Sequence, residues 1–105
     1  METEELFSEI RNCGFDLDQY TWKSKDEKGL GYYSFAKGTN KIEVKTDWCN
    51  RYTHYPKLHI SFIDQSNAFH CTGGYTGWMG NKVLGMFEKP ISKELFLQLI
   101  NHYEF

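Results

Sequence analysis

The sequence predicts an α+β fold: a single domain in which an antiparallel β-meander of five to six strands is flanked by an N-terminal and a C-terminal helix packed on one face. Two observations lead to this prediction. Apolar residues recur at helical spacing in the first and last segments, and they alternate with polar residues in the segments between. A chain of 105 residues has the length of one domain, so we expect residues 1–105 to share a single core.

The first segment predicts a helix over residues 3–13. Thr3 is expected to cap it, and the two glutamates that follow suit the positive end of the helix dipole. Gly14 is expected to end it, because glycine readily takes a positive φ. The helix would bury one apolar stripe, which consists of Leu6, Phe7, Ile10 and Cys13.

The last segment predicts a second helix after Pro90. Ser92 has the hydroxyl of a good N-cap, and apolar residues follow it at intervals of three and four. The predicted buried face of this helix contains Leu95, Phe96, Leu99, Ile100 and Tyr103.

Between the helices the apolar period falls to two, which is typical of strands. Residues 41–46 alternate Lys41, Glu43 and Lys45 with apolar or β-branched residues, so we expect a strand with one solvated face. Residues 58–62 alternate in the same way. Shorter strands are expected at residues 20–23, 30–36, 68–72 and 82–87.

Two polar segments, residues 37–40 and 64–67, have the composition of hairpin turns. A hairpin at the first would align two apolar pairs on the core side, Phe35 with Ile42 and Tyr33 with Val44. A hairpin at the second would do the same for two more, Phe62 with Phe69 and Ile60 with Cys71.

The connections predicted by this meander carry an unusual set of side chains. Residues 48–57 and 73–81 are rich in tryptophan, tyrosine and arginine, which are enriched at binding hot spots. Alternating connections would bring both segments to one end of the sheet, beside residues 24–29. The candidate partner-binding residues are Trp48, Arg51, Tyr52, Tyr55, Tyr75 and Trp78. The alternative is that these rings fold back and cap the core.

Charge and cysteine content narrow the choice of partner and compartment. A net charge of −2 and a pI near 6.1 count against nucleic-acid binding, which needs many basic residues on phosphates. The three cysteines are widely spaced and include no CxxC pair, so we expect reduced thiols and a cytoplasmic location. Neither a signal peptide nor a membrane-spanning run is recognisable, which predicts no membrane association. Composition does not predict the oligomeric state.

A metal site is the most specific chemical function that the residues of the central strands could suggest. The predicted register makes His59 and His70 diagonal neighbours on the polar face, and His54 or Cys49 would have to supply a third ligand. The spacing fits no recognised ligand pattern, so we expect surface histidines, no metal and no cofactor.

Other chemical interpretations are weaker still. Asp16 and Asp18 would share a strand face as paired carboxylates, but a solvated acidic edge explains them equally well. The glycine-rich segment 73–82 lacks the spacing of a phosphate-binding loop, and it predicts a permissive turn.

Three function hypotheses follow from these observations. The first is a small non-enzymatic protein that binds and inhibits a protein partner such as a toxin or effector enzyme, as immunity proteins, antitoxins and phage-encoded inhibitors do. The second is a binding module for single-stranded nucleic acid or a glycan, in which Tyr32, Lys45 and the aromatic segments would stack on the ligand. The third is a small metal-binding protein or enzyme that uses His59 and His70.

Overall fold

The computed structural model describes residues 1–18, 22–23, 31–46, 48–49, 54–55, 57–67, 69–70 and 78–105. Helices α1 (Thr3–Asn12) and α2 (Lys93–His102) flank the strands, as predicted. The strands are β1 (Asp16–Leu17), β2 (Trp22–Lys23), β3 (Gly31–Lys37), β4 (Asn40–Thr46), β5 (Trp48–Cys49), β6 (His54–Tyr55), β7 (His59–Asp64), β8 (Phe69–His70), β9 (Trp78–Met79) and β10 (Lys82–Phe87).

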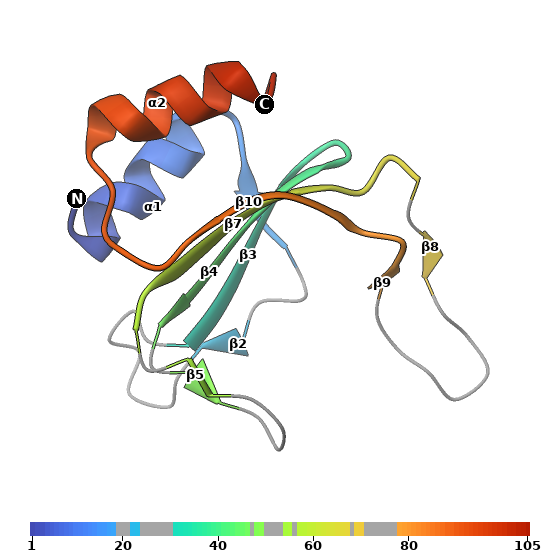
Figure 1. The fold of residues 1–105 in the computed structure, drawn as a ribbon, viewed down its shortest axis with the longest axis horizontal. Helices are drawn as coiled ribbons and strands as arrows, with labels where there is room; N and C mark the ends of the chain where they lie inside the picture. The colour runs from blue at the N-terminus through green and yellow to red at the C-terminus, as the bar shows by residue number, and fades with distance from the viewer. Residues whose placement is uncertain are drawn as a thin grey trace.

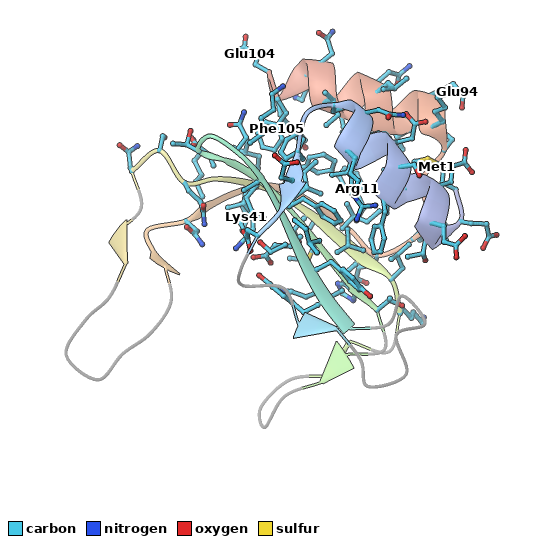
Figure 2. The ribbon with its side chains drawn as sticks, turned by 180° about the vertical axis from the view of Figure 1, so that it is seen from behind. Met1, Arg11, Lys41, Glu94, Glu104 and Phe105 are labelled. Carbon is cyan, nitrogen blue, oxygen red and sulfur yellow. The ribbon has the colours of Figure 1, made fainter. Side chains whose placement is uncertain are left out.

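One open antiparallel sheet forms the body of the molecule, in the order β1-β3-β4-β7-β10, and β2 also pairs with β3. Strands that follow one another along the chain are mostly neighbours in the sheet, so the predicted α+β meander is confirmed. Both helices lie on the same face of the sheet (Figures 1 and 2).

The hairpin at residues 37–40 is confirmed. Phe35 pairs with Ile42 and Tyr33 with Val44, and a two-residue loop of Gly38 and Thr39 joins the strands. Gly38 has a φ of 61°, a backbone conformation in which a residue with a side chain would be strained.

The hairpin predicted at residues 64–67 is wrong. β7 pairs with β4 and β10, so that Phe62 lies opposite Ile42 and Gly85, whereas β8 pairs with β9 outside the sheet. The local turn chemistry is present, because the Ser66 amide donates to Asp64 Oδ1 at 2.8 Å. The Gln65 amide still donates to the Thr39 carbonyl at 2.8 Å. The turn therefore bends the chain without reversing it.

The core lies between the helices and the sheet. Leu6 and Ile10 of α1 and Phe96 of α2 are fully buried against alternate residues of the central strands. Phe105 joins them at 8% exposure, with its ring 5.9 Å from those of both Phe15 and Phe62. The sheet contributes Tyr33, Phe35, Ile42, Val44, Ile60 and Phe62.

The helix ends agree with the predictions at all but one position. Ser92 Oγ accepts from the Leu95 amide at 3.1 Å, and Gly14 takes a φ of 94° just beyond α1. Thr3 is not a cap: it is the first helical residue, and the N-cap is Glu2, whose side chain makes no capping bond. Neither described helix is long and apolar enough to cross a membrane.

Candidate functional site

A two-stranded ribbon extends the sheet at one end. Asp64 and Lys82 form the last pair of β7 and β10, and the same two chains then continue into β8 and β9, where Phe69 pairs with Met79 and His70 with Trp78. Gly80 bends the second chain at a φ of 80°. Figure 1 shows this β8–β9 ribbon standing away from the sheet and both helices.

A second ribbon extends the opposite end of the sheet. Beyond the pair formed by Lys45 and His59, β4 and β7 lead into β5 and β6, where Trp48 pairs with Tyr55 and Cys49 with His54. β5 also contacts β3, so this β5–β6 ribbon stays beside the sheet.

The positions of the two ribbons show that the prediction of a single aromatic surface is wrong. Because the chain does not reverse at residues 64–67, the segments around Trp48 and Trp78 emerge from opposite ends of the sheet. Tyr55 lies with Trp48 in the β5–β6 ribbon. The remaining candidates fall outside the described residues: Arg51, Tyr52 and Tyr75.

The predicted proximity of the histidines is wrong for the same reason. His59 begins β7 and pairs with Lys45, whereas His70 ends β8 in the ribbon at the other end, so the two are not diagonal neighbours. His54 lies in β6, opposite Cys49. Within the part of the chain that the structure describes, no group of three or more His, Cys, Asp or Glu side chains has the arrangement of a metal site.

The expected solvated face of β4 is buried instead. Lys41 is 4% and Glu43 8% exposed, on the sheet face turned away from the helices. The Glu43 carboxylate lies 3.2 Å from Lys41 Nζ and 3.3 Å from Lys45 Nζ, so this one acid bridges two bases. Buried charges need partners, and each of these has one.

Two neighbours complete this buried charged row. The Tyr32 hydroxyl donates to Glu43 Oε1 at 2.5 Å, and Lys45 Nζ lies 5.4 Å from the centre of the Tyr32 ring. Burial, and then the adjacent Glu43 carboxylate, raise the pKa of Tyr32 above its ordinary value. Tyr32 is therefore a hydrogen-bond donor at neutral pH, and Lys45 already covers one side of the ring that nucleic-acid or glycan stacking would use.

The acidic edge predicted at Asp16 and Asp18 has one defined role. Ser34 is fully buried, and its Oγ donates to Asp18 Oδ2 at 2.7 Å. Asp16 pairs with Ala36 and is exposed. Asp18 thus satisfies a buried hydroxyl of β3.

An apolar surface at β10 was not predicted from the sequence. β10 ends the sheet order, and Val83 and Met86 are 52% and 53% exposed. Leu95, expected in the core, is 37% exposed and faces this region. A pocket of about 400 Å³ opens here, lined by Met86, Phe87, Glu88, Lys89, Pro90, Ile91, Ser92 and Leu95.

The signal for this surface was present but ambiguous. A six-residue strand with apolar residues at both odd and even positions has no evident solvent face, although the expected meander already places residues 82–87 last in the sheet. Cys13 is free and packs against the core, where burial raises the pKa of its thiol. Cys71 lies outside the described residues.

The chain was compared with protein-family models, with curated proteins and with solved structures, and it matches none of them.

Proposed function

We propose that this protein is a non-enzymatic binding protein that binds and inhibits a protein partner of the toxin or effector-enzyme type, through the β8–β9 ribbon. The observation that carries the proposal is the position of that ribbon beyond the sheet (Figure 1). A cytoplasmic location is part of the proposal and is supported by the free thiol of Cys13.

Physical chemistry supports this choice of surface. A two-stranded ribbon is marginally stable by itself in water, because it has no layer of its own on which to bury side chains. This one carries Phe69, Trp78 and Met79 at its paired positions. The surface of a partner would add buried contacts to the ribbon, and tryptophan is a residue type that anchors such contacts.

The positions of the two ribbons narrow the proposed binding surface from both aromatic segments to one of them. They lie at opposite ends of the sheet, in a molecule whose longest extent is 42 Å. A standard interface covers about 800 Å² on each partner. One partner of ordinary size would therefore contact one ribbon.

The test is a quantitative binding experiment with matched tryptophan variants. The immobilised wild-type chain would first capture the partner from the native cell, and the partner would then be purified. Calorimetric titration would compare its binding to the wild type, Trp78→Ala and Trp48→Ala in solution. We expect Trp78→Ala to weaken binding by about 2 kcal/mol or more and Trp48→Ala to bind as the wild type does. We also expect the purified partner to lose its activity in the complex.

Two outcomes would contradict the proposal. Normal binding by Trp78→Ala, with the fold intact by circular dichroism, removes the β8–β9 ribbon from the interface. A complex in which the partner keeps its full activity removes the inhibitory role.

A further inference from the structure

The β8–β9 ribbon belongs to a long uncharged segment of the chain. Residues 65–81 contain no Asp, Glu, Lys or Arg, whereas these residue types make up 25% of the whole sequence. Every other run without them has nine residues or fewer. The ribbon that stands away from the sheet and both helices is therefore formed from the least charged part of the chain (Figure 1).

We propose that the partner presents an uncharged, apolar protein surface to the β8–β9 ribbon, so that recognition does not depend on ionic strength. The inference rests on the proposed function, and it adds the chemistry of the surface that the ribbon recognises. Partners with a strongly acidic or strongly basic contact surface are excluded by it.

The composition of the segment matches the centre of a protein–protein interface. Such centres are depleted of charged residues and enriched in aromatic residues and methionine, because a charge that loses its water needs a partner. The paired positions of the ribbon hold Phe69, His70, Trp78 and Met79. A charged patch on the partner would lose its hydration against this ribbon without gaining an ion pair.

The nearest charged residues along the chain lie at the base of the ribbon and offset each other. Asp64 and Lys82 form the last pair of β7 and β10, with one charge of each sign. Hydrogen bonds from Ser66, and then the nearby Lys82 ammonium, hold the pKa of Asp64 below its ordinary value, so its carboxylate is ionised at neutral pH. The base therefore adds no net charge to the contact surface.

The β5–β6 ribbon differs in this respect. The segment that contains it, residues 47–57, includes Asp47, Arg51 and Lys57. β5 also contacts β3, so this ribbon stays beside the sheet. Of the two aromatic segments, the uncharged one is thus the one whose ribbon stands away from the body of the molecule (Figure 1).

The absence of charge disfavours two other classes of partner. Nucleic acid is bound through many Lys and Arg contacts to phosphates. Attachment to an anionic membrane depends on basic residues beside the aromatic ones. Residues 65–81 supply no such residue, so an uncharged surface is the chemistry that fits them.

Ionic strength gives the first test. The partner purified by capture on the wild-type chain would be titrated by calorimetry at pH 8, above the range in which histidine gains its charge. Between about 50 mM and about 500 mM NaCl we expect the dissociation constant to change by less than about twofold, because salt screens only charged contacts. A rise of about tenfold or more would show that ion pairs hold the complex, and it would overturn the inference.

A charge introduced into the ribbon gives the second test. His70 is paired with Trp78 across the ribbon. His70→Lys should raise the dissociation constant by about tenfold or more, because the new ammonium group would lose its water against an apolar surface. His70→Gln adds no charge and should change the constant by less than about threefold. His102→Lys is the matched control, since His102 is exposed in the last turn of α2, and it should bind as the wild type does.

The outcomes separate the inference from the proposed function. If Trp78→Ala weakens binding but His70→Lys binds more tightly than the wild type, the ribbon is the interface and the partner surface is acidic, which overturns the inference alone. Unchanged binding by His70→Lys overturns it as well. A chain that captures no protein contradicts both proposals, and its flotation with phosphatidylcholine vesicles would then identify a neutral lipid surface as the partner.

Discussion

At the scale of single residues, the buried charged row is the least ordinary feature of the molecule. Glu43 holds Lys41 and Lys45, and it accepts a hydrogen bond from the Tyr32 hydroxyl, on a sheet face that an alternating sequence would leave in water. Removing one partner of such a group leaves an uncompensated buried charge. We therefore expect other registers of β3 and β4, which would separate these partners, to be disfavoured.

Tyr32 makes a prediction about the pH dependence of stability. Its pKa is raised in the folded state, whereas in the unfolded chain it ionises near the ordinary value of about 10. Its contribution is fully present below pH 10 and is lost as the pH rises above that value, because only the unfolded state then releases the proton. Tyr32→Phe should make this loss shallower by up to about 1.4 kcal/mol per pH unit.

Urea denaturation of the wild type and of Tyr32→Phe between pH 8 and about 11 would measure this difference. Parallel stability curves for the two proteins would show that the Tyr32 phenol is not held in its protonated form by burial and Glu43.

At the scale of elements, the bulge in β10 fixes how the edge strand meets α2. Gly85 lies opposite Phe62 on the helix side of the sheet, and a Cβ at this position would overlap the Tyr103 hydroxyl and lie 3.1 Å from its Cζ. The Tyr103 ring has little room to move, because its centre is 5.2 Å from that of Phe62 and 6.0 Å from that of Phe105. The glycine thus allows close approach of strand and helix.

Gly85→Ala should lower the free energy of unfolding by about 1–3 kcal/mol through this overlap. In a Tyr103→Phe background Gly85→Ala should lower the free energy of unfolding by less, since the hydroxyl oxygen nearest to the added Cβ is gone. A double-mutant cycle by chemical denaturation measures the coupling.

Gly38→Ala is the matched control for this cycle. Gly38 has a positive φ, and a Cβ added there would meet nothing within 4 Å, so its cost comes from the backbone alone and Tyr103→Phe should not change it. Equal relief at both glycines would contradict the proposed contact between Gly85 and Tyr103.

At the scale of the whole molecule, stability is expected to be uneven. The helices cover one face of the sheet and bury its central strands, whereas the β8–β9 ribbon stands beyond that core (Figure 1). Segments with few buried apolar contacts open at low free energy. The surface that we propose for partner binding is therefore the part that binding would stabilise most.

Hydrogen exchange measures this difference directly. Amides at the paired positions of β8 and β9 should exchange much faster than those of β4, which has a hydrogen-bonded neighbour on each side. Addition of the partner should slow exchange in β8 and β9 and leave β4 unchanged. Equal protection of the ribbon and β4 in the free protein would show that the ribbon is already stabilised without a partner.

The sequence by itself determined the elements that depend on local chemistry. Helical spacing with Ser92 and Gly14 located both helices, and alternation located the main strands and the pairing of Phe35 with Ile42. These features follow from neighbours within a few residues along the chain. They also sufficed for the α+β class, because two amphipathic helices and one sheet have few ways to bury their apolar faces.

Tertiary structure decided what depends on distant partners. The polar segment 64–67 has the chemistry of a hairpin turn, but β10 takes the place beside β7 that the sequence assigned to residues 68–72. This one exchange moves the segments around Trp48 and Trp78 to opposite ends of the sheet and separates His59 from His70. Strands pair so that the whole sheet buries the most apolar surface, and no local pattern records that competition between segments.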